Sequence, residues 1–227
     1  MSKILHQEME KLKRDLLFLG SLVKEAVEKS ISAFYDCNKP MAENVIEDDQ
    51  KVDQKEVDIE QSCLQILALH QPVAEDLRFI ASVMKINSDL ERMGDSAVSI
   101  ARRAVHYAER NPISLPSDLR EMSQYALSMV QDSLSAFVNK DVTVAHEVCR
   151  RDKEVDERQA QMFRKLKEIM KEDSEMVSVS LDVFTITKRL ERIADLATNI
   201  CEDVIYMVEG KIIRHKRATD PKMSLDD

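Results

Sequence analysis

Two stretches of this chain, residues 83–104 and 183–204, carry apolar side chains at alternating intervals of three and four residues. A strand would need alternation at every second residue, whereas this spacing places the apolar side chains on one stripe of an α-helix. The first series is Val83, Ile86, Leu90, Met93, Ala97, Ile100 and Ala104. The second series is Val183, Ile186, Leu190, Ile193, Ala197, Ile200 and Val204. Such a stripe packs along neighbouring helices at a shallow crossing angle, so the pattern predicts a bundle of long helices.

Residues that interrupt helices are rare in the rest of the chain. The 227 residues include 3 Gly, 5 Pro and no Trp, while 44% are hydrophobic and 33% are charged. Helix-ending sequences fall at residues 36–40, 70–72, 111–118, 139–141 and 171–175. They leave six long segments with helical periodicity between them. We therefore expect an all-α fold of six long antiparallel helices.

Short motifs recur at a nearly constant distance. "SISAF" at residues 30–34 returns as "SLSAF" from residue 133, and "DQKVD" at residues 49–53 returns as "DKEVD" from residue 152, both 103 positions later. "LERMGD" from residue 90 returns as "LERIAD" from residue 190, only 100 positions later. A loop shorter by three residues in the second copy explains the change. The repeats predict two tandem homologous three-helix bundles.

The boundary between the two copies falls where two prolines, Pro112 and Pro116, stand close together. We expect the first repeat to span residues 1–112 and the second 113–212, with Ser117 and Asp118 capping the first helix of the second repeat. Residues 213–227 lose the helical periodicity, so they are expected to form a flexible tail.

Charge and composition exclude several classes of protein. The net charge of −9 disfavours direct binding to nucleic acid, which requires basic groups against phosphates. No window approaches the ~20 apolar residues of a membrane span, and charges come too early for a signal peptide. No two cysteines form a CxxC pair, and we expect all four to be reduced and mostly buried. They are Cys37, Cys63, Cys149 and Cys201. We expect a soluble protein without membrane insertion.

Each "LER" motif contains a Glu and an Asp four residues apart, Glu91 with Asp95 and Glu191 with Asp195. Taking Leu90 as an a position of the heptad, both acidic residues face away from the apolar stripe. Like charges at this spacing lie one above the other and destabilise the helix by a few tenths of a kcal/mol. A cation held between them would reverse the sign of that effect.

The preceding helix of each repeat contains a second acidic pair, Asp49 with Asp53 and Asp152 with Asp156. The apolar pattern puts Asp49 and Asp152 on or beside the packed stripe, where an ionised carboxylate needs a partner or water. If the second and third helices of each repeat pack antiparallel, the two pairs come near one another. Oxygen-only clusters suit Mg, Mn, Ca, iron and sometimes Zn. We therefore hypothesise one metal site in each repeat.

Other interpretations of the acidic pairs stay open. With 42 acidic residues in the chain, several such pairs arise by chance and are solvated or paired with Lys or Arg. A duplication also copies structural features, so the repeat of the pair is weak support for a site. None of the five histidines follows a Glu by three residues, and no HExxH, Walker A or GxSxG motif is present. The residues identify no catalytic group.

The repeats resemble a known family. Residues 71–104, "QPVAEDLRFIASVMKINSDLERMGDSAVSIARRA", are similar to the signature helix of the PhoU family of phosphate-regulon accessory proteins. Residues 186–210, "ITKRLERIADLATNICEDVIYMVEG", are similar to its second copy. The similarity covers nearly the whole chain up to Gly210, and the motifs, their order, the duplication and the length agree.

The resemblance implies a fold and a set of metal ligands. It implies two similar three-helix bundles side by side in a flat six-helix array. It also implies that acidic E/DxxxD motifs hold iron or zinc clusters at the surface in some members, and Mg or Mn in others. Carried over to this chain, the ligands are Asp49, Asp53, Glu91, Asp95, Asp152, Asp156, Glu191 and Asp195. Asn199 is a weaker addition, because its equivalent is Ser99, so the two sites need not bind equally well.

The resemblance further implies a non-enzymatic negative regulator of phosphate uptake and phosphate-regulon signalling. It implies contact with the ATPase subunit of the phosphate ABC transporter and with the sensor histidine kinase of a two-component system. Such a protein is cytoplasmic, peripheral to the inner membrane through its partners, and compatible with a homodimer. Residues 71–78 are a hypothetical partner contact, with a simple helix start as the alternative.

Two other functions stay open from the sequence. One is a metal-dependent phosphohydrolase that uses the acidic clusters, since paired metals can clamp phosphate oxygens or activate water. The other is a helical adaptor that binds no metal and whose acidic pairs are solvated surface.

Overall fold

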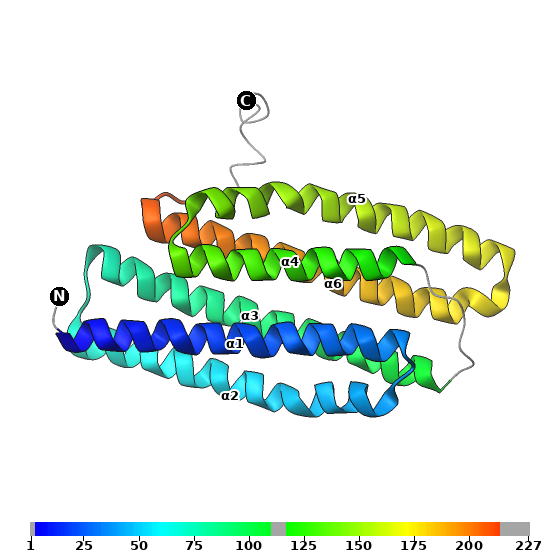
Figure 1. Ribbon diagram of the computed structural model, residues 1–227, viewed down its shortest axis with the longest axis horizontal. Coiled ribbons are helices and arrows are strands. Elements are labelled where there is room, and N and C mark those ends of the chain that lie inside the picture. The colour runs from blue at the N-terminus through cyan, green and yellow to red at the C-terminus, as the bar shows by residue number, and fades with distance from the viewer. Residues whose placement is uncertain (1–2, 110–116, 214–227) are drawn as a thin grey trace, which may run out of the picture.

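The computed structural model describes residues 3–109 and 117–213 as long α-helices, with no strand among these residues (Figure 1). The helices are α1 (Lys3–Tyr35), α2 (Lys39–His70), α3 (Ala74–Ala108), α4 (Ser117–Asn139), α5 (Val142–Glu172) and α6 (Val177–Glu209), and a short 3₁₀ turn, η1 (Ser174–Met176), precedes α6. Each predicted interruption lies at a boundary between two helices. The prediction of an all-α fold with six long helices is confirmed.

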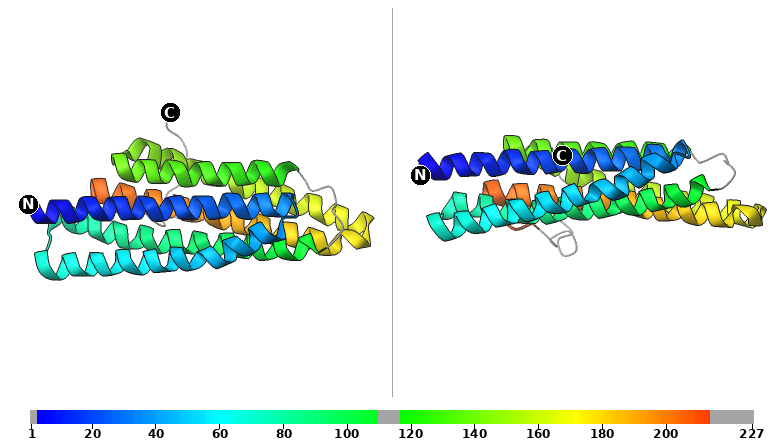
Figure 2. Two further views of the ribbon diagram at one scale, coloured as in Figure 1. Left: turned by 60° about the horizontal axis from the view of Figure 1, so that its bottom comes forward. Right: turned by 90° about the horizontal axis from the view of Figure 1, so that it is seen from below.

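The helices form two three-helix units that lie side by side in a flat array. The first unit packs α1, α2 and α3 against one another, and the second packs α4, α5 and α6. Helices α3 and α6 run along each other and join the units, with α1 and α4 also in contact. Seen edge-on, α1 and α4 form one layer over a second layer that has α3 and α6 at its centre (Figure 2).

The predicted apolar stripes form the middle of the core. Every residue of the two series, from Val83 to Ala104 and from Val183 to Val204, is buried. The buried surface of α3 and α6 faces neighbours on several sides, because each of these helices packs against the two other helices of its unit and against the other unit. Burial of these side chains supplies the main favourable free energy of folding.

Contacts between α3 and α6 relate the two units by an approximate two-fold axis. Ser82 donates a hydrogen bond from Oγ to the carbonyl oxygen of Asp203 at 3.2 Å. At the equivalent positions of the opposite units, Asp182 lies against Arg103, with 3.6 Å between carboxylate and guanidinium. The contact between these two positions therefore occurs twice, once with the first position on α3 and once with the first position on α6.

The helix ends repeat the duplication as well. Asn38 caps α2 by accepting a hydrogen bond from the Met41 amide at 3.1 Å, and Asp141 caps α5 by accepting one from the Val144 amide at 3.1 Å. Gly210 ends α6 in the left-handed region with φ of 70°.

Several predictions concern residues that the structure does not describe. The proline pair at the predicted boundary, Pro112 and Pro116, lies outside the described residues, and so does the tail from residue 214. The capping side chain predicted at Ser117 also lies outside them. Of the four cysteines, Cys63, Cys149 and Cys201 are buried and Cys37 is partly exposed.

Candidate functional site

The antiparallel packing of α2 and α3 brings the four predicted carboxylates of the first repeat together. Asp49 shows this best, because its pKa is raised from 3.8 to about 6, first by burial and then by the nearby charges of Asp53 and Asp95. Asp53 is on α2 and Asp95 on α3, so the coupling crosses the helix interface. The Arg102 guanidinium opposes the rise in the pKa of Asp49.

Glu91 belongs to the same cluster. Burial raises the pKa of this carboxyl above its usual 4.5, and the charges of Asp95, Asp53 and Glu56 act in the same direction. The predicted pairs on α2 and α3 therefore form one cluster, with Glu56 as an additional member. We call these five residues the first acidic cluster.

The second repeat has an equivalent cluster between α5 and α6. The pKa of Asp195 is raised from 3.8 to about 7, first by burial and then by the charges of Glu191, Asp152 and Asp156, while Arg192 opposes the rise. Asp195 is half-buried, whereas its counterpart Asp95 is exposed.

Glu191 is coupled to the same side chains. Burial raises its pKa above 4.5, and the charge of Asp156 is the next contribution. Lys188 and a hydrogen bond with Gln159 oppose the rise. We call Asp152, Asp156, Glu191 and Asp195 the second acidic cluster.

A glycine allows the close approach of α2 and α3 beside the first acidic cluster. A Cβ atom at Gly94 would lie 3.1 Å from Cγ1 of Val52 and 3.4 Å from Oδ1 of Asp49. The equivalent residue of the second repeat is Ala194, which is fully buried. Gly94, the glycine of "LERMGD", therefore allows Asp49 to lie next to α3.

Sequence reasoning missed Glu56. It lies seven residues after Asp49, two helical turns along the same side of α2, so its spacing was available as a signal. Its counterpart in the second repeat is Gln159, which is neutral. The first acidic cluster therefore carries more negative charge than the second.

Asn87 is a second residue that the sequence did not point to. Its side-chain amide donates to the backbone oxygen of Glu56 at 2.9 Å and to Oε1 of Glu56 at 3.1 Å. Among the described residues, its Oδ1 is a buried side-chain oxygen without a hydrogen-bond partner. This oxygen lies one helical turn before Glu91, so a cation or a water molecule at the first acidic cluster would satisfy it.

The remaining predicted ligand, Asn199, is exposed one turn beyond Asp195. Its equivalent, Ser99, instead accepts a hydrogen bond from Nε of Arg189 at 2.9 Å. In the second cluster, Thr198 donates from Oγ1 to Oδ1 of Asp152 at 3.3 Å. The polar surroundings of the two clusters therefore differ.

The chemistry of both clusters fits a hard or borderline metal ion. All the predicted ligands are oxygen donors, and the ionised forms of Asp49, Glu91, Glu191 and Asp195 are disfavoured by burial and by neighbouring carboxylates. In residues 3–109 and 117–213, however, no three His, Cys, Asp or Glu side chains are already placed to hold a metal ion. Metal binding at Asp49, Glu91, Asp195 and the other predicted ligands stays a prediction.

The predicted partner contact, residues 71–78, forms the turn between α2 and α3 and the start of α3. Gln71 ends α2 in the left-handed region with φ of 44°, and Ala74 also has a positive φ of 48°. Val73 is 73% exposed. A role of residues 71–78 in partner binding stays a prediction.

Comparison with known proteins identifies the family. The model of the PhoU domain matches the chain twice, at residues 16–104 and 119–204. This chain belongs to the PhoU family. The two PhoU domains coincide with the two three-helix units, so the resemblance and the tandem duplication expected from the sequence are both confirmed.

Curated PhoU proteins match over most of their length. A phosphate-specific transport system accessory protein PhoU homolog from Aquifex aeolicus is 39% identical over 93% of this chain and 96% of its own. A homolog from Pseudomonas aeruginosa is 36% identical over 100% of this chain and 94% of its own. The PhoU of Escherichia coli is 33% identical over 92% of this chain and 86% of its own.

Solved PhoU structures have the same fold. The crystal structure of PhoU from Pseudomonas aeruginosa has a TM-score of 0.88 at 37% identity, covering 91% of this chain and 99% of that one. The phosphate transport system regulatory protein PhoU from Streptococcus pneumoniae has a TM-score of 0.87 at 32% identity, covering 92% and 99%.

None of the helices in the described part of the chain has an apolar stretch long enough to cross a bilayer.

Proposed function

We propose that this protein is a non-enzymatic regulator of phosphate transport that lowers phosphate uptake and phosphate-regulon signalling. The relatives from Aquifex aeolicus, Pseudomonas aeruginosa and Escherichia coli are named accessory proteins of a phosphate-specific transport system. The relative from Streptococcus pneumoniae is named a regulatory protein of phosphate transport. The chain matches these proteins across both repeats, which supports a shared role.

We further propose that each acidic cluster binds metal, with iron or zinc as the first expectation and manganese or magnesium as alternatives. The observation that carries this proposal is the convergence of carboxylates from two helices in both repeats. Asp49 and Asp195 are held where their charged forms are unfavourable, with pKa values of about 6 and about 7. A bound cation supplies positive charge that stabilises those carboxylates in the ionised form.

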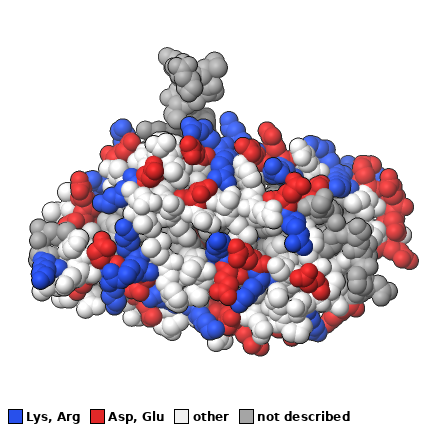
Figure 3. All heavy atoms as spheres, in the orientation of Figure 1, with Lys and Arg blue, Asp and Glu red and all other residues white. Residues whose placement is uncertain are grey.

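The proposed partners are the ATPase subunit of the phosphate ABC transporter and the sensor histidine kinase of the phosphate two-component system. Acidic and basic side chains are interspersed over the face shown in Figure 3, so this face offers a partner local charged groups rather than one broad charged field. We place the protein in the cytoplasm, at the inner membrane through these partners. Metal at the clusters would rigidify the helix surfaces that dock.

Elemental analysis of untagged protein purified without chelator tests the metal sites. The wild type is compared with a variant in which Glu91, Asp95, Glu191 and Asp195 are changed to Ala. We expect stoichiometric metal in the wild type and loss of metal in the variant. A control removes four exposed acidic residues elsewhere, Glu10, Glu43, Glu147 and Glu157, and should keep the metal. Equal trace metal in all three proteins would remove the metal proposal and leave a helical adaptor.

Partner binding is tested separately from metal content. Purified transporter ATPase and the cytoplasmic part of the sensor kinase are titrated with the protein, with and without chelator. Binding that survives both the chelator and the loss of all eight predicted carboxylates would show that regulation does not depend on metal. Absence of binding to either partner would contradict the proposed regulatory contact.

A further inference from the structure

A cavity of about 270 Å³ opens between α1 and α2 of the first repeat. Its apolar wall is formed by Leu22, Ala26, Val45 and Val52. Asp49 also lines it, so the cavity adjoins the first acidic cluster. The volume approaches the range of small-ligand sites and exceeds the space of one water molecule.

The rim of this α1–α2 cavity is charged. Glu25 pairs with Lys29 at 2.6 Å, and Asp48 pairs with Lys51 at 2.7 Å. All four side chains are between 46% and 67% exposed. Exposed pairs of this kind are weak and exchange readily, so each carboxylate is available to another cation.

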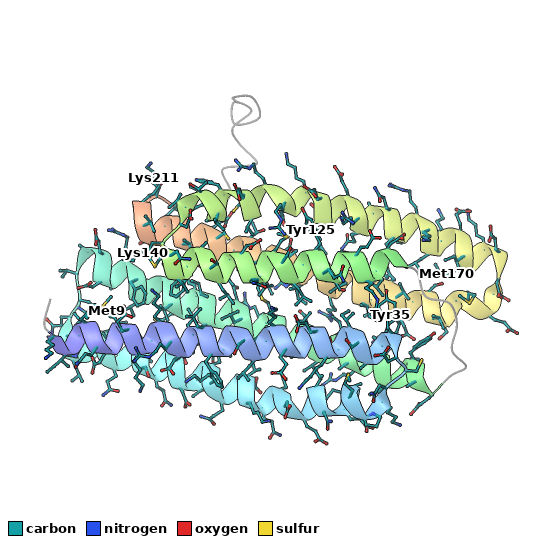
Figure 4. All side chains as sticks on the ribbon, in the orientation of Figure 1. Met9, Tyr35, Tyr125, Lys140, Met170 and Lys211 are labelled. Atoms are coloured by element: carbon teal, nitrogen blue, oxygen red, sulfur yellow. The ribbon has the colours of Figure 1, made fainter. Side chains whose placement is uncertain are left out.

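The second repeat has the same groove between α4 and α5, and its own arginine occupies it. Arg151 stands 103 positions after Asp48. Its guanidinium donates from Nη1 to Oδ2 of Asp132 at 2.5 Å and from Nη2 to the Ser128 hydroxyl. It also stacks 4.9 Å from the ring centre of Tyr125, which lies on the side of α4 that faces α5 (Figure 4).

The two grooves share two wall valines, and their other wall and filling groups differ. Val148 and Val155 replace Val45 and Val52. Tyr125 replaces the smaller Leu22, so the second groove also offers an aromatic face. The duplicated scaffold therefore holds a guanidinium in one copy and an open cavity in the other.

The acidic groups of the two grooves match at one position and differ at the others. Asp152 stands where the first repeat has Asp49, beside the groove in each case. Asp132, which holds the Arg151 guanidinium, is replaced by Lys29. Glu25 and Asp48 supply carboxylates at the rim of the open cavity instead.

We propose that the α1–α2 cavity receives an arginine side chain from a partner protein. The guanidinium is planar, weakly hydrated and able to place an apolar face on the cavity wall while donating to Glu25, Asp48 and Asp49. A lysine ammonium is more strongly hydrated and cannot make the same flat contact. The net charge of −9 favours a basic partner segment.

This site goes beyond the proposed metal clusters and partners, and it can be tested independently of them. The full-length protein, isotope-labelled on Leu and Val methyl groups, is titrated with the blocked peptide acetyl-Ala-Arg-Ala-amide and followed by NMR. We expect saturable shifts at Leu22, Val45 and Val52 with a dissociation constant on the order of 1 mM. The matched lysine peptide should bind at least fivefold more weakly. The same result is expected in the presence of a chelator.

Substitutions in the cavity give opposite, predictable effects. Lys29→Asp introduces the carboxylate found at the equivalent Asp132 and should tighten arginine-peptide binding at least threefold. Ala26→Trp places in the cavity a side chain larger than the equivalent Met129, which leaves room for the Arg151 guanidinium, and should abolish binding. A triple variant with Leu22→Tyr, Lys29→Asp and Asp48→Arg copies the occupied groove and should also abolish it. The single Ala26→Trp variant serves if the triple variant fails to fold.

Several results would overturn the proposal. Equal affinity for the arginine and lysine peptides would mean that the cavity does not recognise a guanidinium. Weaker binding of the arginine peptide to the Lys29→Asp variant would contradict recognition of a guanidinium by carboxylates. Shifts of the same methyl groups on addition of inorganic phosphate, if they disappear in Lys29→Asp, would identify an anion site instead. Absence of saturable shifts in the wild type would mean that the cavity does not accept an arginine side chain.

Discussion

At the scale of single residues, the unusual groups are carboxylates whose charged forms the fold disfavours. The pKa values of about 6 for Asp49 and about 7 for Asp195 have burial as their first cause and neighbouring carboxylates as their second. A raised carboxyl pKa means that the folded protein binds more protons than the unfolded chain between the two pKa values. These residues therefore stabilise the fold at acid pH and destabilise it at neutral pH unless a cation is present.

The stability of the metal-free protein should fall as pH rises from about 4 to about 7. Below the unfolded pKa of 3.8 both carboxyls are protonated in either state, and the favourable contribution is fully present. It is lost as pH passes through the folded pKa values, and we expect a total loss of about 2 kcal/mol after solvent screening. Urea unfolding with chelator across this pH range measures it. A free energy of unfolding that rises over the same interval would contradict the raised pKa values.

Replacing Asp195 with Asn should raise the stability of the metal-free protein at pH 8. The substitution removes a half-buried charge repelled by Glu191, so we expect a gain of about 1 kcal/mol in the free energy of unfolding at pH 8 and almost none at pH 4. Thermal and urea unfolding report this difference. Exposed Glu157→Gln is the control and should change neither value. An equal gain at both pH values would show that charge is not the cause.

At the scale of the helices, the contact between α2 and α3 decides how closely the acidic groups meet. Gly94 lies on this contact, and a Cβ atom there would press on Val52 and Asp49. Gly94 is buried in the middle of α3, where glycine has a cost in helix propensity of about 1 kcal/mol relative to Ala. The close approach of the two helices gives a physical reason for glycine at this position.

Gly94→Val should destabilise the protein by about 2 kcal/mol, because the branched side chain overfills the α2–α3 contact. Arg92→Val, at an exposed position two residues earlier on α3, controls for the helix propensity of valine. Urea unfolding of both variants measures the difference. A Gly94→Val protein no less stable than the Arg92→Val control would mean that α2 and α3 are not in close contact at this point.

At the scale of the whole molecule, the two repeats depend on each other through α3 and α6. Each of these helices packs within its own unit and against the other unit. The interface contains buried polar groups, Asp182 and Asp203, that are paired with the opposite unit through Arg103 and Lys85. Separation of the repeats would expose an apolar surface and leave these carboxylates without those partners.

A single repeat should therefore not fold into a stable monomer. We expect residues 117–227 expressed alone to show helical circular dichroism with broad, non-cooperative unfolding, or to self-associate through the exposed side of α6. Co-expression with residues 1–116 should restore a soluble complex with cooperative unfolding. Size-exclusion chromatography and thermal unfolding measure both outcomes. A monomeric fragment that unfolds as sharply as the full chain would show that the units are independent.

The sequence allowed most of the architecture to be predicted. Helix boundaries followed from turn residues and caps such as Asn38 and Asp141, and the duplication followed from motifs such as "LERMGD" and "LERIAD". The two carboxylate pairs of each repeat were also predicted to meet, since a short link forces antiparallel neighbours. Glu56 was missed because an acidic residue seven positions after Asp49 cannot be told, from the sequence, from the many acidic residues on solvated helix faces. Asn87 was missed because its unpartnered oxygen exists only once α2 and α3 are packed.

The sequence by itself therefore determined the elements and their duplication, because apolar spacing and helix-ending residues act over a few turns of local chain. Only the tertiary structure decided which charges are disfavoured and which groove is open. Asp195 acquires its raised pKa from burial between α5 and α6, and the α1–α2 cavity exists because Leu22, Ala26 and Asp48 are smaller than the equivalent Tyr125, Met129 and Arg151. Burial, electrostatic coupling and cavity volume depend on distances between helices, which local sequence patterns do not specify.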